Sequence, residues 1–430
     1  MKVAFYTLGC KVNQYDSQAV TEVFAAKGYE VVGSYAHADI YVVNSCTVTA
    51  ESDRKTRQAV RRFKSMHPDS IVVLTGCMPQ AFPDTAQALP EADIVLGNRD
   101  YHALFGLLED FLSCQSRQIQ ITPHSMGDAY TGTGIKGFKA RTRAVVKIED
   151  GCDRFCSYCI IPFARGSVRS KALSEIKTEL EGLEAAGFLE IVLVGINLSA
   201  YGNDTGKSLC DVVDLACSFE KIKRVRLGSL EPQGLTDSVI KSLSKQAKLC
   251  PQFHLSLQSG CDETLHRMNR HYTTAEYETV CNKLRAAFKD CTLTTDVMVG
   301  FPTESRDEFH ESLEFVKKIR FEKVHVFPYS PRSGTKAAAM KPQISKSEKG
   351  KRSRLMIAAA QEIRKEFLES QVGTTVEVLL EEHMQSGMMK GYTPNYTPVR
   401  ACGENLSPGQ IRRVTITGVE NDLCVGRVVR

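Results

Sequence analysis

From residue 1 to about residue 112, short apolar runs alternate with longer amphipathic stretches. The short runs are bounded by glycine or polar residues, which is typical of buried strands, and the longer stretches between them favour helices. This alternation predicts a parallel α/β sheet. The expected strands are Val3–Thr7, Ile40–Val43, Ile71–Thr75 and Ile94–Leu96, and the expected helices are Ser17–Lys27, Thr49–Lys64 and Tyr101–Leu112.

The same alternation returns between residue 144 and about residue 332, now over six units. Six strand–helix units predict a partial (β/α) barrel, with chemistry at the carboxyl ends of its strands. Strands are expected at Ala144–Ile148, Ile191–Val194, Val225–Leu227, Phe253–Leu257, Thr292–Met298 and Val324–Phe327, and helices at Leu173–Ala186, Leu209–Phe219, Asp237–Lys245, Thr274–Phe288 and Asp307–Ile319.

The remaining segments differ in pattern. Residues 113–143 are polar and rich in glycine, serine and threonine, which is typical of a linker. Residues 333–371 form a basic connecting segment that ends in a helix, Leu355–Ser370. Short strands with Gly and Asn turns predict a small β-barrel at the carboxyl end. The predicted class is therefore α/β, with an amino-terminal domain (1–112), a partial barrel (144–332) and a small β-barrel (372–430).

Composition narrows the class of protein. A chain of 430 residues, 42% of them hydrophobic, can bury the cores of two or three domains. Lysine and arginine exceed aspartate and glutamate by 55 to 50, a weak basic bias that permits a nucleic-acid partner without requiring one. No apolar run reaches about 18 residues and the chain does not open on a secretory leader, so we expect a cytoplasmic protein outside the membrane. In that reducing compartment the 15 cysteines are expected to be metal ligands and buried thiols.

Three of these cysteines lie in one loop directly after a predicted strand. Cys152, Cys156 and Cys159 have the spacing C-x3-C-x2-C, and thiolates this close together suit ligation of one iron–sulfur cluster. A [4Fe–4S] cluster needs four ligands, so three cysteines leave one iron open to a substrate or cofactor. Zinc sites favour paired C-x2-C knuckles, and no second pair follows this loop. A disulfide does not suit a long chain without a secretory leader.

Three further cysteines each follow a predicted strand of the amino-terminal domain. Cys10, Cys46 and Cys77 are distant in sequence, yet the carboxyl ends of parallel strands meet at one edge of a sheet. The sequence therefore predicts a second cluster with an open iron. The alternative is three unrelated buried thiols, because free cysteine is commonly buried.

The cysteine loop resembles that of the radical S-adenosylmethionine (SAM) superfamily. The segment Leu8–Ser17, with Asn44-Ser45-Cys46 and Gly76-Cys77, resembles the amino-terminal domain of the methylthiotransferases. Residues 372–430 resemble the TRAM domain, an RNA-binding module, so the resemblance covers essentially the whole chain. It implies that SAM is cleaved to a radical at one [4Fe–4S] cluster and that a second presents the sulfur to be transferred. The implied ligands are Cys152, Cys156 and Cys159 for the first cluster and Cys10, Cys46 and Cys77 for the second.

The resemblance also implies residues that contact SAM. Tyr158 and the segment that contains Gly300 and Pro302 match positions near the adenine ring. Glu231 and Gln258 are candidates for hydrogen bonds to the polar groups of SAM. Alternatively, Glu231 is a helix cap and Gln258 an ordinary loop amide.

Two pairs of residues have open alternatives. Arg165 and Arg169 follow the cysteine loop, so they could hold an RNA phosphate or the SAM carboxylate, or be solvated at the surface. Tyr392 and Tyr396 near the carboxyl end could stack on bases or pack at the rim of the small barrel.

The resemblance implies a tRNA methylthiotransferase. A radical cofactor suits this activity, because acid–base chemistry cannot readily remove the hydrogen of an unactivated C–H carbon, where the methylthio group must be placed. Its motifs look most like the branch that acts on threonylcarbamoyl-adenosine 37 of tRNA. The other branches act on isopentenyl-adenosine 37 or on an aspartate of a small-subunit ribosomal protein. The implied partners are the tRNA anticodon loop and an electron donor such as a flavodoxin or ferredoxin, and we expect a monomer. Two other classes remain open: a sulfur-inserting radical enzyme for a small metabolite, and a non-catalytic RNA-binding iron–sulfur protein.

Overall fold

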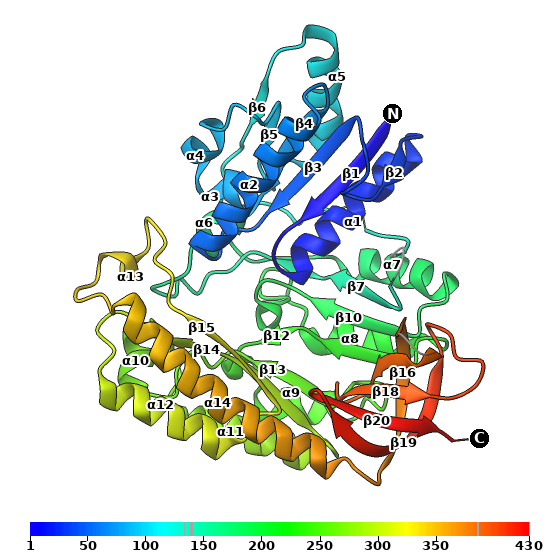
Figure 1. The fold of residues 1–430 in the computed structure, drawn as a ribbon, viewed down its shortest axis with the longest axis vertical. Coiled ribbons are helices and arrows are strands. Elements are labelled where there is room, and N and C mark those ends of the chain that lie inside the picture. Colours follow the sequence, from blue (N-terminus) through cyan, green and yellow to red (C-terminus); the bar gives the residue numbers. More distant parts are fainter. Residues whose placement is uncertain (133, 138–140, 385–386, 430) are drawn as a thin grey trace.

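The computed structural model describes residues 1–132, 134–137, 141–384 and 387–429. Three parts follow one another along the chain: an amino-terminal sheet domain, an open barrel and a small closed barrel (Figure 1). A long helix connects the second part to the third. None of the helices within the described residues is both long and apolar enough to span a membrane.

The amino-terminal domain is a six-stranded parallel sheet in the order β2-β1-β3-β4-β5-β6. Alternate residues of β3 enter different cores, because both faces of the sheet are covered: Tyr41 and Val43 lie in one, Ile40 and Val42 in the other. The strands are β1 (Lys2–Thr7), β2 (Glu30–Val32), β3 (Ile40–Ser45), β4 (Ile71–Gly76), β5 (Ile94–Leu96) and β6 (Gln118–Gln120). The helices are α1 (Lys11–Ala26), α2 (Ala50–Met66), α3 (Cys77–Ala81), α4 (Pro83–Gln87), η1 (Tyr101–Ala103) and α5 (Leu104–Cys114).

The middle of the chain forms an open barrel of parallel strands that follow one another in chain order. Strands β11, β10 and β7 pair in one sheet, and β12, β13, β14 and β15 in a second; the run from β11 to β12 is interrupted only at Gly228. The strands are β7 (Arg143–Lys147), β10 (Glu190–Val194), β11 (Arg224–Leu227), β12 (Ser229–Leu230), β13 (Gln252–Leu255), β14 (Thr292–Val299) and β15 (Lys323–Pro328). The predicted α/β class with a partial barrel is confirmed.

Helices cover the outside of this barrel because the strands direct alternate apolar residues toward them. Leu180 and Leu183 of α7, for example, share one core with Ile191 and Leu193 of β10. The helices and turns are α6 (Ile161–Arg165), α7 (Leu173–Ala185), η2 (Leu198–Ala200), α8 (Leu209–Ser218), η3 (Pro232–Gly234), α9 (Asp237–Leu243), α10 (Asp262–Arg267), α11 (Thr274–Ala287), α12 (Arg306–Ile319) and α13 (Lys336–Ala339). A short antiparallel pair, β8 (Glu149–Asp150) with β9 (Arg169–Ser170), brackets the cysteine loop.

Helix α14 (Lys346–Ser370) leads from β15 to the carboxyl-terminal barrel (Figure 1). It begins nine residues before the predicted Leu355, because Ser345 caps it by accepting a hydrogen bond from the Glu348 backbone N–H at 3.2 Å. The barrel that follows is closed, in the order β16-β17-β18-β20-β19, as the strand pattern predicted. Its strands are β16 (Thr375–His383), β17 (Met389–Tyr392), β18 (Pro398–Cys402), β19 (Ile411–Glu420) and β20 (Leu423–Val428).

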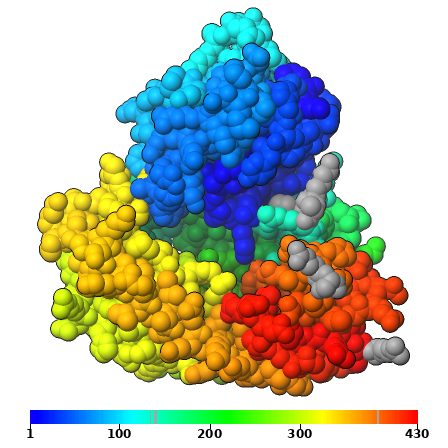
Figure 2. All heavy atoms as spheres, viewed as in Figure 1, coloured from blue at the N-terminus to red at the C-terminus, as the bar shows by residue number. Residues whose placement is uncertain are grey.

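Buried arginines join the three parts. Arg226 of β11 donates at 2.9 Å to the carbonyl of Pro394 in the small barrel. Arg332, which follows β15, donates to Thr47 Oγ1 at 2.7 Å and to Asp53 at 2.5 Å in the amino-terminal domain. Figure 2 shows the surface hollowed where the three parts meet, with the open barrel at the bottom of the recess.

Candidate functional site: two cysteine triads

The structure brings Cys152, Cys156 and Cys159 together in the loop between β8 and α6; we call them the loop triad. The loop is tightly closed, because the Cys152 N–H donates to the Gly166 carbonyl and the Cys159 N–H to the Cys156 carbonyl, each at 2.9 Å. Gly151 has φ +90°, and a Cβ there would lie 1.9 Å from the Ser167 carbonyl oxygen. Only glycine can therefore start this loop.

The chemistry of the loop triad fits iron ligation. Burial raises the pKa of Cys152 and of Cys159 to about 12, so both are neutral thiols at pH 7 in the absence of a metal. Bound iron ions would stabilise the thiolate forms, since a coordinating thiol is deprotonated. Two N–H groups approach the sulfurs at 3.4 Å: the Arg270 guanidinium approaches Cys156 and the Ile161 backbone approaches Cys159.

Glu231 lies beside the loop triad and is held by Arg270. The Arg270 guanidinium makes a two-pronged ion pair with the Glu231 carboxylate, at 2.5 and 3.1 Å, while it also contacts Cys156. Glu231 precedes η3, but its side chain makes no capping hydrogen bond. The structure therefore does not support the helix-cap alternative.

Buried polar atoms near the loop triad lack partners. Ser157 Oγ and Asn197 Oδ1 are both buried, and neither has a hydrogen-bond partner among the described residues. Ser157 lies inside the triad loop, and Asn197 follows β10, whose carboxyl end lies beside β7. Unpaired buried polar atoms cost free energy, so this edge of the barrel is suited to a polar ligand.

The other predicted SAM-contacting residues lie on two neighbouring segments of the barrel. Tyr158 packs against an apolar cluster that contains Phe301, between Gly300 and Pro302. Gly300 has φ +69°, and its N–H donates to the Glu304 carboxylate at 2.7 Å. Gln258 is buried, with φ +67°, and its backbone pairs with β14 through hydrogen bonds of 2.9 Å to Asp296 and from Met298. Its backbone is therefore held in a conformation that non-glycine residues rarely adopt.

The second set, Cys10, Cys46 and Cys77, gathers at the carboxyl edge of the amino-terminal sheet; we call it the sheet triad. Cys10 is exposed at the start of α1, whereas Cys46 and Cys77 are buried. The backbones approach so closely that a Cβ on Gly9 would lie 2.7 Å from Cys46 Cβ. Burial raises the pKa of Cys46, and it raises that of Cys77 to about 12, so the Cys77 thiol too would be deprotonated only by a bound metal.

Asn13 fixes the loops of the sheet triad to one another. Its side-chain N–H2 donates to the carbonyls of Leu8 and Ser45 at 2.8 and 2.9 Å. Its side-chain oxygen in turn accepts from the Arg165 guanidinium at 2.5 Å. Asn13 thereby connects the sheet triad to the segment that follows the loop triad.

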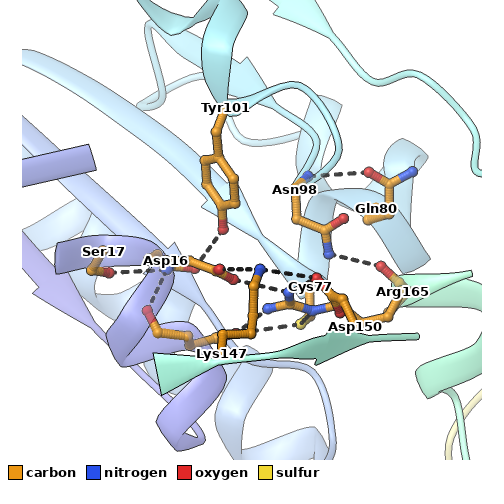
Figure 3. Close-up of polar contacts among 12 residues, drawn as sticks. Asp16, Ser17, Cys77, Gln80, Asn98, Tyr101, Lys147, Asp150 and Arg165 are labelled. Carbon is orange, nitrogen blue, oxygen red and sulfur yellow. Dashed lines mark hydrogen bonds and ion pairs between the residues drawn. The ribbon is translucent and has the colours of Figure 1, made fainter. Parts of the chain in front are cut away.

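Arg165 is the centre of a buried ion network that joins the amino-terminal domain, at Cys77 of the sheet triad, to the strands and helix that flank the loop triad (Figure 3). Its guanidinium pairs with Asp16 of α1 at 2.9 Å and Asp150 of β8 at 3.0 Å, and its Nε lies 3.4 Å from Cys77 Sγ. Lys147 of β7 bridges the same two carboxylates, at 2.6 and 3.1 Å. Burial alone would raise the pKa of Asp150, but the charges of Arg165 and Lys147 outweigh it and hold that pKa below its ordinary value.

This network corrects two sequence alternatives for Arg165 and Arg169. Neither arginine is solvated at the surface, because their exposed fractions are 1% and 7%. Arg165 is fully engaged with the protein, and Arg169 donates at 2.8 and 2.9 Å to the carbonyls of Arg165 and Ser167. These protein contacts disfavour the alternative that they bind an RNA phosphate. No sequence pattern indicated their carboxylate partners.

The two tyrosines of the small barrel lie in an interface. The rings of Tyr392 and Tyr396 stack on each other with centroids 4.6 Å apart. Arg143 lies 5.1 and 5.0 Å from their centroids, and Arg226 lies 4.6 Å from that of Tyr396. These contacts favour the packing alternative over base stacking, because cations of the open barrel already occupy the ring faces.

Lys11 was missed as a candidate although it directly follows Cys10. Lys11 as a residue is exposed to solvent, but its amino group lies close to many protein atoms. This crowding, with the charges of Arg143 and Arg226, lowers the pKa of Lys11 to about 8. Only the fold reveals this setting, since the arginines belong to the open barrel.

Two family models match the chain, one for each triad. Residues 2–97 match the uncharacterized protein family UPF0004, and residues 146–316 match the radical SAM superfamily. Over its whole length the chain is 37% identical to threonylcarbamoyladenosine tRNA methylthiotransferase MtaB of Bacillus subtilis (strain 168), with 100% of this chain and 96% of the relative covered. The MtaB protein of Aquifex aeolicus (strain VF5) is 38% identical, with 97% and 100% covered. The chain belongs to the radical-SAM methylthiotransferase family.

The family includes relatives that are named for a second activity. The tRNA-2-methylthio-N(6)-dimethylallyladenosine synthase of Pelotomaculum thermopropionicum is 32% identical, with 97% of this chain and 95% of the relative covered. Among solved structures, the radical SAM methyltransferase TsrM of Kitasatospora setae has a TM-score of 0.54 at 13% identity, over 77% of this chain and 76% of that one. That likeness supports the fold alone. As a radical-SAM methylthiotransferase the chain is an enzyme, and its family uses SAM and [4Fe–4S] clusters.

Proposed function

We propose that this methylthiotransferase adds a methylthio group to C2 of N6-threonylcarbamoyl-adenosine at position 37 of tRNA. The observation that carries the proposal is the pair of cysteine triads, which lie on two domains joined by the buried Arg165 network. The substrate follows the relatives, because those at 37% and 38% identity carry that activity in their names and the dimethylallyladenosine relative is 32% identical.

Each triad is proposed to hold one [4Fe–4S] cluster. The loop triad supplies three thiolates and leaves one iron for SAM, and the sheet triad does the same for the sulfur to be transferred. When bound, SAM and its cluster supply the radical chemistry that removes hydrogen from an unactivated C–H bond. The chain itself ligates the clusters, orients the substrate and excludes water from the site.

The residues around the loop triad are proposed to orient SAM. The Glu231 carboxylate, fixed by Arg270, is suited to accept a hydrogen bond from the SAM amino group. Ser157 Oγ and Asn197 Oδ1 offer buried polar atoms without partners. Tyr158, with the segment of Gly300 and Pro302, provides an apolar surface for the adenine ring, and Gln258 a further polar contact.

The proposed activity requires two partners, the tRNA substrate and an electron donor. The anticodon loop of tRNA would enter the recess between the three parts, with the carboxyl-terminal barrel as the RNA-binding module. Cleavage of SAM at a cluster consumes an electron, so a donor of the flavodoxin or ferredoxin class is required. We propose a monomer that acts in the cytoplasm, where the tRNA is modified.

The test is mass spectrometry of tRNA nucleosides from a strain that lacks this gene. We expect 2-methylthio-threonylcarbamoyl-adenosine to be absent, and to return with the wild-type gene but not with Cys156→Ala or Cys46→Ala. Cys114→Ala is the matched control, because Cys114 is exposed on α5 and outside both triads. Restoration by either triad variant would contradict the ligand assignment.

The same spectra separate the branches of the family. If 2-methylthio-isopentenyl-adenosine disappears and the threonylcarbamoyl nucleoside does not change, the substrate is isopentenyl-adenosine, which is the same nucleoside as dimethylallyladenosine. If neither nucleoside changes, the proposed tRNA substrate is wrong, and the aspartate of a small-subunit ribosomal protein becomes the substrate to examine.

A further inference from the structure

Lys11 is a cation at the start of α1, the end of that helix that faces the open barrel. It is the first residue of α1 and directly follows Cys10 of the sheet triad. Its side chain is exposed, and it makes no hydrogen bond or ion pair within the described part of the chain. The start of α1 faces the open barrel, just above β7 and β10 (Figure 1).

The groups that face Lys11 are mainly cations. Arg143 of β7, Arg226 of β11 and Arg141 are the positive charges that act on it, and Glu190 of β10 is a negative one. Glu190 is already shared, because Arg226 lies 2.9 Å from it and Arg143 lies 3.9 Å from it. Glu190 is therefore already neutralised by arginines and leaves the charge of Lys11 unbalanced.

Glu381 does not change this balance. It belongs to β16 of the small barrel and pairs with Arg143 Nε at 2.7 Å. Arg224 of β11 adds one more cation, which lies 3.8 Å from Glu190 and 3.8 Å from the exposed Glu377. Four cations, Lys11, Arg143, Arg224 and Arg226, thus lie near three carboxylates, Glu190, Glu377 and Glu381. Excess positive charge in a recess attracts an anionic group of the substrate.

We propose that Lys11 is the centre of an anion site that binds the carboxylate of the threonylcarbamoyl group. This inference rests on the proposed function. Lys11 is the peptide neighbour of Cys10, so a base whose C2 reaches sulfur at the sheet triad has its six-membered ring close to Lys11. The threonylcarbamoyl group is attached to that same ring at N6 and ends in a carboxylate. A dimethylallyl group is uncharged and gains nothing from Lys11, so the residue discriminates between the two substrates.

A phosphate of the tRNA backbone is the second anion that could occupy this site. The two sources differ in a measurable way, because every tRNA carries phosphates and only the modified base carries the carboxylate. A phosphate contact would strengthen the binding of all tRNAs equally. A carboxylate contact would strengthen the binding of threonylcarbamoyl-tRNA alone.

The test compares three anticodon stem-loops that differ only at adenosine 37: threonylcarbamoyl-adenosine, its neutral carboxamide, and unmodified adenosine. Affinity and the KM and kcat of the holoenzyme are measured under anaerobic conditions, with Lys11→Gln, Lys11→Arg and the control Lys365→Gln. Lys365 is an exposed lysine on α14. Iron content and SAM cleavage verify that each variant carries its clusters.

We expect Lys11→Gln to weaken binding of the threonylcarbamoyl RNA by about 10-fold to 100-fold and to raise its KM, as loss of a charge-assisted hydrogen bond implies. Binding of the carboxamide and of unmodified RNA should not change. For wild type, replacing the carboxylate by the carboxamide should cost as much as the mutation, and the two losses should not add. Lys11→Arg should restore part of the affinity, and Lys365→Gln should behave as wild type.

Equal weakening of all three RNAs by Lys11→Gln would assign the site to phosphate and overturn the inference. Equal binding of the acid and the carboxamide by wild type would overturn it as well, and that comparison stands even if Lys11→Gln fails to retain its clusters. If wild type forms no methylthio product from the threonylcarbamoyl RNA, the proposed function itself fails. The two failures are therefore distinguishable.

Discussion

Replacing Arg165 by methionine should destabilise the protein more than any surface change of charge. The Arg165 side chain is 1% exposed and pairs with Asp16 and Asp150 at 2.9 and 3.0 Å. In the variant, Asp16 would keep only Lys147, and Asp150 would keep Lys147 and the more distant Arg169 at 3.9 Å. Leaving a buried charge without its partner costs about 3–5 kcal/mol. At about 2–4 °C per kcal/mol for domains of this size, Tm should fall by on the order of 10 °C.

The assay is thermal unfolding followed by circular dichroism in the absence of oxygen, since the chain contains no tryptophan to report by fluorescence. Arg54→Met is the matched control. Arg54 is 58% exposed and pairs with Glu51 on the surface of α2, where solvent screens the ion pair, so Arg54→Met should unfold close to the wild-type temperature. If Arg165→Met unfolds at the same temperature as Arg54→Met, the network does not stabilise the protein. Adding Asp16→Asn to Arg165→Met should recover part of the loss, because it removes one unpaired charge.

Two further predictions concern stability near the triads. Burial raises the pKa of Glu149 well above 4.5, so the native state keeps a proton that the unfolded chain releases, and stability should fall as pH rises above about 4.5. Glu149→Gln should therefore flatten the dependence of Tm on pH between about pH 5 and 8. An unchanged slope in this variant would show that Glu149 is not the source of the pH dependence. A Cβ on Gly76, at φ +97°, would lie 2.4 Å from Asn44 Oδ1, so Gly76→Ala should cost more than about 2 kcal/mol and lower iron content. Gly28→Ala is the control, because Gly28 has a similar φ with no atom within 4 Å and should cost only about 1 kcal/mol; equal losses in urea unfolding would refute the steric argument.

The cysteine sites could be predicted because their geometry follows from local rules. The loop triad is contiguous in sequence, and each cysteine of the sheet triad directly follows a strand of a parallel sheet, where strand ends must meet. The apolar strands were found for the same reason, since β3 and β4 are buried on both faces. The three-residue edge strands β2 and β6 were missed because they are too short and too polar to show a period.

Partners that depend on the packing of domains could not be predicted. Asp16 and Arg165 are 149 residues apart, and nothing near either residue in the sequence indicates a charge that must be buried. From the sequence, Arg165 could therefore only be a candidate for an RNA phosphate or the SAM carboxylate, or a solvated surface arginine. Tyr396 shows the same limit, because the cations on its ring come from β7 and β11 rather than from its own barrel.

The buried charges explain why the two triads keep a fixed arrangement. Asp16 belongs to the amino-terminal domain and Arg165, Lys147 and Asp150 to the open barrel, so each domain alone would expose or bury charges without their partners. Desolvated charges are compensated only at short distances and in good geometry, and a shift of about 1 Å between the domains would weaken several contacts at once. The Arg165 guanidinium also approaches Cys77, and its backbone lies on the helix that follows Cys159. The Arg165 side chain and the carboxylates that hold it therefore tie the domain of the sheet triad to the segment that follows the loop triad.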